Sequence, residues 1–485
     1  MRSVVPLLAL AVATLASSAA ATPGVPCRYY GINAGAPVWN GTIVVDTFFA
    51  QQMAASGAYA VRIDFLLDGA SQWDGAALGK YDAVVDAVIA AGLEPLGMMN
   101  YGAAVGGQAQ WNDDPDQDGS NDYVVSFATG SQAVIEHFAD RIKRWEIWNE
   151  PSCWSNPNWA TDPQNAGCSY LLPRVFAKLM AEVYVRNEAV LKAHQISLVS
   201  GGLFAHDIGG SLTTATDYMS EVYAQGVWDW MQANKQRRYA WDYLGYHIYV
   251  EQGALTDGTK LAVYADDMRQ LATQNNDPAP FSLTEIGWTT AAVSEHVQAV
   301  NLETTYVTLA ARADVDQVFW FSFRDAPGAD LYFGIRDGIG APKEAVEAMI
   351  AVSAGCMTPV KPDAGKDATS LETGPGEDAQ NPVDGAVEDA TNEADQSAPD
   401  GGSAKDGAAS GGDAAPPVFA GRADDSGCAC RMRGGPGEVS GWWWGVIALG
   451  MGMWRLRTLF GARALGPRAC RRASGNGPLG PGARW

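Results

Sequence analysis

Basic side chains and cysteines are scarce in this chain of 485 residues. Lysine and arginine number 33 against 55 aspartates and glutamates, which gives a formal net charge of −22. Such an acidic protein repels the phosphate backbones of DNA and RNA, so we expect no nucleic-acid partner. The seven cysteines contain no Cys-x-x-Cys pair and do not cluster with the five histidines. We therefore expect no metal site and no other cofactor.

Long apolar runs are also missing. The run at residues 4–15 follows Arg2 and precedes three alanines, an arrangement typical of a secretory signal that is cleaved after Ala21. A second run, residues 442–454, has 13 residues and is short for a transmembrane span. We therefore expect residues 1–21 to be a signal peptide and the mature protein to be secreted into an oxidising compartment.

The C-terminal part of the chain differs in composition from the rest. Residues 358–427 are mostly Asp, Ala, Gly, Ser and Pro, with 15 acids and 4 bases from position 361 onward. That segment cannot bury enough apolar surface to offset the entropy of ordering, so we predict a disordered acidic linker. Residues 428–460 combine a cysteine motif with the second apolar run, and residues 461–485 form a basic tail rich in glycine and proline.

Short β-rich runs alternate with longer helical patterns between residues 22 and 357. Predicted helices include 81–91, 173–194 and 294–311, and the predicted strands are 29–33, 60–66, 93–100, 144–149, 196–201, 243–250, 281–285 and 317–323. Eight strand–helix units in a segment of this length suit one (β/α)₈ TIM barrel, an α/β fold. A doubly wound open sheet is the alternative, but no glycine-rich phosphate loop follows the first strand.

Two of the predicted strands end on a glutamate. Glu150 closes the fourth strand in residues 144–151, and Glu285 closes the seventh in residues 281–288. Catalytic groups of such barrels come from the C-terminal ends of the strands, and the fourth and seventh strands lie nearly opposite across the mouth. A glycosidase needs two such carboxyls, one to protonate the leaving oxygen and one to attack the sugar.

Residues 29–325 resemble clan A glycoside hydrolases, which are retaining β-glycanases on a (β/α)₈ barrel. The resemblance is carried by Trp148-Asn149-Glu150-Pro151 and by Thr284-Glu285-Ile286-Gly287-Trp288. It implies that Glu150 is the acid/base, that Glu285 is the nucleophile, and that Asn149 binds the sugar hydroxyl next to the scissile carbon. The family-five-like and family-thirty-nine-like groups of the clan both fit.

The same resemblance implies further substrate-binding residues. Arg62 matches an arginine that steadies the nucleophile, although a barrel ion pair is an alternative role. His247 and Tyr249 match a histidine and a tyrosine that line the same subsite.

An aromatic floor beneath the sugar is also implied. Trp320 is the candidate for that floor, and the alternation of its strand leaves Phe321 or Phe323 as alternatives.

Four cysteines are candidates for disulfides in a secreted protein. Cys153 and Cys168 lie close together just after the first glutamate motif, so we expect them to close a loop. Cys27 and Cys356 flank the barrel segment and can pair if its ends meet.

The C-terminal segment resembles the sorting tails of myxobacterial surface proteins, with cysteines, an apolar helix and then arginines. The resemblance implies membrane or cell-surface attachment, for which Cys428 and Cys430 are anchor candidates. The chain departs from that pattern by continuing 28 residues beyond Arg457.

Three other polar positions have competing interpretations. Glu146 lies four residues before Glu150 on the same strand, so we expect a structural salt bridge there. His206 either contacts substrate or bonds its own loop. Residues 114–119 begin like a calcium loop, but Val125 stands where that loop requires glutamate, so a plain polar loop is favoured.

The sequence as a whole predicts a monomeric, secreted or surface-anchored retaining β-glycosidase that acts on a polysaccharide, oligosaccharide or smaller β-glycoside. Endo action is favoured over exo action, because tethering to a cell surface suits attack on an external polymer. The sugar and the linkage stay open. The alternative from another class is a catalytically inert carbohydrate-binding or adhesion protein on the same barrel.

Overall fold

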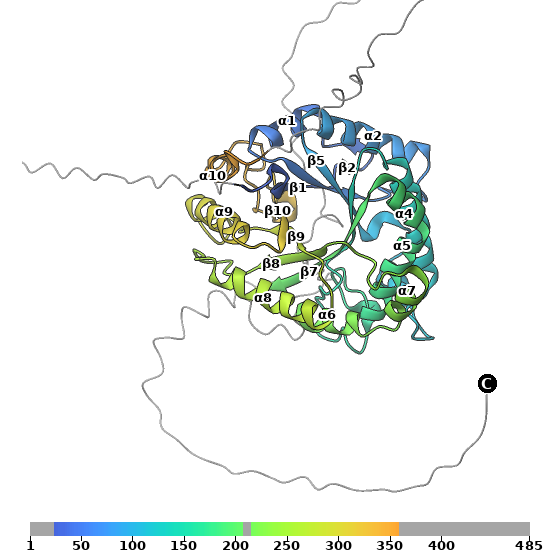
Figure 1. The fold of residues 1–485 in the computed structure, drawn as a ribbon. Coiled ribbons are helices and arrows are strands. Elements are labelled where there is room, and N and C mark those ends of the chain that lie inside the picture. The colour runs from blue at the N-terminus through green and yellow to red at the C-terminus, as the bar shows by residue number, and fades with distance from the viewer. Residues whose placement is uncertain (1–23, 207–214, 358–485) are drawn as a thin grey trace, which may run out of the picture. The chain divides into compact units, whose positions relative to one another are not determined.

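Eight parallel strands close into a barrel in the computed structural model, which describes residues 24–206 and 215–357 (Figure 1). Around the barrel the strands follow the order β1-β10-β9-β8-β7-β6-β5-β4. Their bounds are β1 Tyr30–Gly35, β4 Ala60–Phe65, β5 Glu94–Met99, β6 Arg144–Asn149, β7 Ser197–His206, β8 Leu244–Tyr249, β9 Phe281–Ile286 and β10 Val315–Trp320. A small antiparallel pair, β2 (Val38–Trp39) and β3 (Thr42–Ile43), lies outside it. The predicted TIM barrel is thus confirmed, and the open-sheet alternative is wrong.

Helices form a ring outside the strands (Figure 1). They are α1 Thr47–Ala55, α2 Gly75–Ala90, α3 Gln108–Trp111, α4 Asp122–His137, α5 Pro173–His194, α6 Ala215–Tyr223, α7 Val227–Lys235, α8 Thr259–Gln274, α9 Glu295–Ala310 and α10 Glu344–Ser353. Short 3₁₀ turns occur at η1 Cys27–Tyr29, η2 Tyr101–Ala103, η3 Pro163–Asn165 and η4 Pro327–Ala329. α2 begins at Gly75, six residues before the predicted start of this helix at residue 81. The preceding Asp74 caps the helix, because its side chain accepts hydrogen bonds from the backbone N–H groups of Ala76 and Ala77.

Two barrel strands differ from their predicted bounds. β7 continues to His206, because its last four residues pair with β8. β10 ends at Trp320, so Phe321 and Phe323 lie in the loop after the strand.

One layer of side chains inside the barrel is apolar. Ala60, Leu96, Val199 and Phe319, from four different strands, form a cluster separate from the main core. Gly31 makes room for it, since a Cβ there would lie 2.4 Å from the Phe319 ring. Arg62 follows Ala60 by two residues and therefore shares its face of β4, so the next layer toward the strand ends is polar.

Both predicted disulfides are present, Cys27–Cys356 and Cys153–Cys168. The first joins the two ends of the barrel segment, where Cys27 N–H also donates to Met357 O at 3.0 Å.

None of the helices in residues 24–206 and 215–357 combines the length and apolar character needed to cross a bilayer. The predicted signal peptide, linker, anchor cysteines Cys428 and Cys430 and basic tail lie outside the described residues.

Candidate active site

The end of β6 breaks the simple alternation of a strand. Trp148 has φ of 76° and Glu150 has φ of 48°, a region that bulky residues rarely adopt. Strict alternation would put Glu146 and Asn149 on opposite faces. Both nevertheless bind the same guanidinium inside the barrel. The Trp148 ring instead packs edge-on against Trp111 of α3.

A bulge in β9 turns two neighbouring side chains inward. Between Leu283 and Ile286 the strand advances three residues while β10 advances two, and β8 shows the same shift. Bulges of this kind re-aim side chains next to active sites. Here the extra residue lets Thr284 and Glu285 both face the barrel interior, where each makes hydrogen bonds to other strands.

The Glu285 carboxylate is held by donors from three strands. Arg62 Nη1 donates to its Oε1 at 2.6 Å, and the Tyr249 hydroxyl donates to its Oε2 at 2.8 Å. Asn33 Nδ2 of β1 approaches Oε1 at 3.5 Å. Glu285 is 1% exposed. These donors fix both oxygens of Glu285 in place, since they come from rigid strands.

Arg62 is the hub of the buried network. Its Nε donates to Glu146 Oε2 at 2.5 Å and its Nη2 to Asn149 Oδ1 at 2.7 Å, in addition to the bond with Glu285. Burial alone would lower the pKa of Arg62, but the charges of Glu146 and Glu285 outweigh it and hold that pKa well above its usual value. Arg62 is thus an ion-pair partner of both Glu146 and Glu285.

Glu150 has a different environment from Glu285. It is 1% exposed, and burial raises its pKa to about 7, although the hydrogen bond and charge of His247 act in the opposite direction. The negative charge of Glu285 adds to the rise. A carboxyl with such a pKa still carries its proton near neutral pH, as a general acid must.

His247 connects Glu150 to the rest of the network. Its Nδ1 lies 3.0 Å from Glu150 Oε1, and its Nε2 lies 2.9 Å from Thr284 Oγ1. Burial would lower the pKa of His247, but Glu285, Glu146 and Glu150 together raise it to about 9.

Thr284 requires a proton on Nε2 of His247. Its hydroxyl donates to Glu146 Oε1 at 2.8 Å. Burial would raise the pKa of Glu146, but Arg62 and His247 hold it below its usual value, so Glu146 is ionised and only accepts. The Thr284 hydroxyl has only this one proton, so in its contact with His247 its oxygen must accept a hydrogen bond from Nε2–H.

The proton of Glu150 can also be placed. Since the pKa of His247 is raised to about 9, the ring is an imidazolium near neutral pH, with a proton on each nitrogen. Its Nδ1–H then donates to Glu150 Oε1. The acidic proton of Glu150 therefore belongs on Oε2.

The two candidate catalytic carboxyls lie close together. One oxygen of Glu150, one oxygen of Glu285 and one ring nitrogen of His247 all lie within 4.8 Å of one another. Retaining glycosidases place their carboxyls about 5 to 5.5 Å apart, whereas inverting ones need about 6.5 to 9.5 Å to admit a water. The spacing here fits a two-step displacement through a covalent intermediate.

The structure buries the three aromatic candidates for the floor beneath the sugar, Trp320, Phe321 and Phe323. Trp320 is fully buried, stacks on Trp288 and donates its Nε1–H to the Phe333 carbonyl. It exposes no face in this structure, and its contact with sugar stays a prediction. Phe333 lies between Phe321 and Tyr249, with ring centroids 5.5 Å and 6.0 Å away.

Sequence reasoning missed Asn33, Thr284, Phe333 and Asp64. Asp64 follows Arg62 by two residues on the same face of β4. It is 4% exposed, and its Oδ1 has no hydrogen-bond partner within residues 24–206 and 215–357. Burial raises its pKa to about 6. Its position two residues after Arg62 on a predicted strand was the available signal.

Asp114 and His206 were the remaining polar positions with competing interpretations, and the choice between substrate contact and loop hydrogen bonding at His206 stays a prediction. Asp114 pairs with Arg174, and its second oxygen accepts from Gly119 N–H, so this carboxylate is already neutralised by a cation rather than free for calcium. The His206 ring packs on Phe204, which in turn packs on Tyr249.

Two groups of side chains in the described residues have the spacing of metal ligands. In the first, Glu150 with Cys153 and Cys168, the sulfurs are joined in a disulfide and are not thiolates. In the second, Glu150 with His247 and Glu285, both nitrogens of the histidine are engaged in hydrogen bonds. Neither donor set fits a metal in this state.

No family model matches the chain, and no curated protein matches its sequence. The chain is similar to a family 39 glycoside hydrolase from Bacteroides cellulosilyticus WH2, with 18% identity and a TM-score of 0.45, over 68% of this chain and 64% of that one. It is also similar to β-glucosidase 1317, with 17% identity and a TM-score of 0.44, over 64% of this chain and 88% of that one. A third similar structure is ZgEngAGH5_4, solved with a cellotriose, with 13% identity and a TM-score of 0.49, over 69% of this chain and 99% of that one. Similarities this low do not establish a function for this chain.

Proposed function

We propose that this protein hydrolyses O-glycosidic bonds of a polysaccharide or β-glycoside with retention of configuration. The observation that carries the proposal is the pair of buried glutamates, Glu150 and Glu285, with carboxyl oxygens within 4.8 Å and opposite surroundings. One carboxyl has its pKa raised to about 7, and the other accepts hydrogen bonds from Arg62 and Tyr249. Divergent environments of two titratable groups mark the acid and the nucleophile.

In the first step the Glu285 carboxylate attacks the anomeric carbon. The C–O bond to the leaving group breaks, and its oxygen takes the proton from Glu150 Oε2. Arg62 and Tyr249 hold the attacking carboxylate. Asn149, fixed by Arg62, supplies an amide that can bind the neighbouring hydroxyl.

In the second step Glu150 acts as the base. Once Glu285 is esterified its negative charge is gone, and that charge is one cause of the raised pKa of Glu150. Glu150 therefore gives up its proton more easily and can accept one from an incoming water. The water attacks the anomeric carbon, and Glu285 leaves as a carboxylate.

We also propose secretion, with retention at the cell surface or outer envelope. The two disulfides, Cys27–Cys356 and Cys153–Cys168, support an oxidising compartment. Membrane attachment through the C-terminal segment, a monomeric state and endo action on a polymer are further parts of the proposal. The sugar is left open, since barrel and catalytic pair occur with many substrates.

A hydrolysis panel tests the proposal. Purified protein is assayed on β-glucans, mannans, xylans and aryl β-glycosides, and NMR follows the anomer that forms first. We expect turnover with retention and its loss in Glu285→Gln. An inverted product would refute the roles given to the two glutamates. Binding without turnover, unchanged in Glu285→Gln, would favour an inert adhesin.

A further inference from the structure

The loop after Glu150 leaves the active site and returns to it. Cys153 N–H donates to the Glu150 carbonyl oxygen at 2.9 Å. The hydroxyl of Ser169 donates to the same oxygen at 3.0 Å. Ser169 directly follows Cys168, so the Cys153–Cys168 disulfide joins the two segments that hold the Glu150 backbone.

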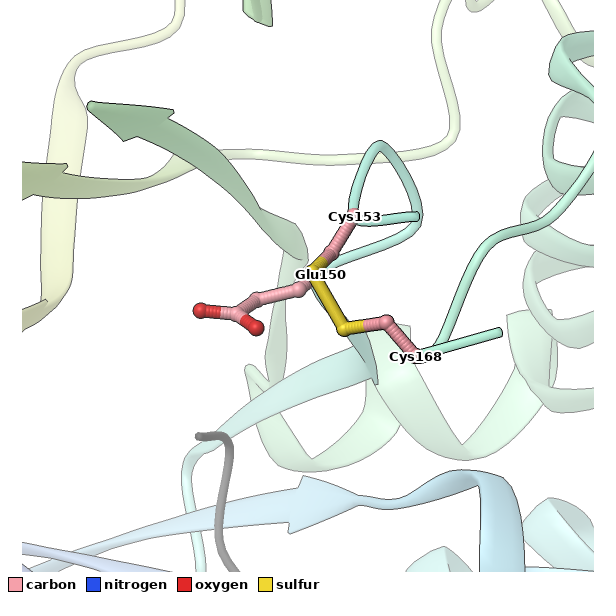
Figure 2. Close-up of side chains that lie close together, drawn as sticks. All are labelled: Glu150, Cys153 and Cys168. Atoms are coloured by element: carbon pink, nitrogen blue, oxygen red, sulfur yellow. A yellow bond between two sulfur atoms is a disulfide. The ribbon is translucent and has the colours of Figure 1, made fainter. Parts of the chain in front are cut away.

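The disulfide also lies beside the side chain of Glu150. Figure 2 shows Glu150, Cys153 and Cys168 together, with the sulfur–sulfur bond next to the glutamate. A carboxyl oxygen of Glu150 and both sulfurs lie within 4.8 Å of one another. A disulfide is a poor hydrogen-bonding partner compared with water, so it shields this side of the carboxyl from solvation.

The loop has enough other contacts to remain folded without this bond. Gln108 of α3 exchanges two hydrogen bonds with the backbone of Gly167, at 2.5 Å and 3.0 Å. Leu171 N–H donates to Pro151 O at 3.0 Å. Trp154 and Trp159 stack within the loop. Opening the disulfide therefore loosens the loop locally and does not unfold the barrel.

The bond can be reached by a thiol. Cys153 is 2% exposed, whereas Cys168 is only partly buried. One thiolate of a dithiol attacks the Cys168 sulfur, and the Cys153 sulfur leaves and takes up a proton. The second thiol then displaces Cys168, so both cysteines are reduced and the dithiol is oxidised to its own disulfide.

We propose that the Cys153–Cys168 disulfide is a positioning element for Glu150, and that its reduction by a dithiol reversibly lowers turnover without unfolding the protein. This inference rests on the proposed function, in which Glu150 is the acid/base. The disulfide keeps the carboxyl in place through the backbone and keeps water away from it.

The direction of the effect follows from the groups that face Glu150. These are His247 of β8, Glu285 of β9 and Arg62 of β4, and all three lie on barrel strands, outside the loop that the disulfide closes. Burial is the largest cause of the raised pKa of Glu150. Admitting water on the disulfide side therefore lowers this pKa and ionises the general acid at a lower pH.

The test compares the two disulfides of the same chain. The double variant C153A/C168A is the test and C27A/C356A is the matched control, each measured with and without dithiothreitol. We expect C153A/C168A and reduced wild type to lose roughly 10-fold or more in kcat on phenyl β-glycosides and less on dinitrophenyl β-glycosides, which need little protonation. The alkaline limb of activity should move down by about one pH unit. The control should behave as wild type before reduction.

A second measurement does not depend on turnover. Carbon-13 NMR titration of the Glu150 carboxyl, assigned with E150Q, should show a lower pKa in reduced wild type. An unchanged Glu150 titration, or an unchanged leaving-group dependence on reduction, would overturn the inference. If the wild type is inactive on all substrates but shows the expected NMR shift, the proposed glycosidase function is refuted, while the effect of the Cys153–Cys168 disulfide on Glu150 is supported. If C153A/C168A fails to fold, reduced and alkylated wild type takes its place.

Discussion

His247 Nδ1 lies 3.0 Å from Glu150 Oε1, and this contact links the candidate general acid to a buried cation. The same imidazole reaches Thr284 through its other nitrogen at 2.9 Å. Both nitrogens are therefore fixed by partners, and the ring cannot turn. As a result the Glu150 carboxyl presents its other oxygen, Oε2, to a substrate.

The pH profile should carry the signature of this pair. Glu150 acts in its protonated form and its pKa is raised to about 7, so kcat/KM should fall as pH rises through about 7. The hydrogen bond and charge of His247 lower that pKa. In His247→Ala the alkaline limb should therefore move to higher pH, alongside a loss of activity. The control is His137→Ala, since His137 pairs with Asp82 on the helical face and should leave the limb in place. A limb that moves down in His247→Ala would contradict the assigned network.

The two glutamates should respond differently to leaving groups. Glu150→Gln removes the proton donor, so we expect a loss of about 10²- to 10⁴-fold on phenyl β-glycosides and a smaller loss on dinitrophenyl ones. Glu285→Gln removes the attacking group and should abolish turnover of both. Steady-state kinetics on a series of aryl glycosides measures the difference. Equal dependence on the leaving group in both variants would rule out distinct acid and nucleophile roles.

Thr284 should contribute to stability through its hydroxyl alone. Thr284→Val keeps the shape of the side chain but leaves His247 Nε2–H without its acceptor in a buried site. An unsatisfied buried donor costs about 1–3 kcal/mol, so the free energy of unfolding should fall by that amount. Thr284→Ser keeps the hydroxyl and serves as the control. Urea unfolding at neutral pH measures both, and equal stability of the two variants would show that the bond is unimportant.

Asp64 should make stability depend on pH. Burial raises its pKa to about 6 in the folded protein, above its value of about 3.9 in an unfolded chain. The folded state thus binds the proton more tightly, and this contribution to stability is lost as pH rises from about 4 through 6. Asp64→Asn removes the titration. Its stability relative to wild type should rise over that range by up to ~3 kcal/mol, measured by urea unfolding at several pH values. A difference that stays constant with pH would refute a raised pKa.

Local patterns in the sequence carry much of the fold. The predicted bounds of β6 and α5 agree with the structure, because β6 is a compact run of large side chains and α5 begins at Pro173 and ends at an exposed left-handed Gln195. Alternation of strand and helix over the whole segment was enough to predict the barrel. The ends of β7 and β10 differ because the pairing of their last residues depends on neighbouring strands.

The residue types and their places on the predicted strands were determined by the sequence itself. Glu150 and Glu285, with Arg62 and His247, are recognisable there because each chemistry requires that side chain. The tertiary structure alone decided how these side chains face one another. The positive φ at Trp148 and the extra residue in β9 redirect single side chains. Such effects arise from register and packing between strands far apart in the chain, and no local pattern encodes them.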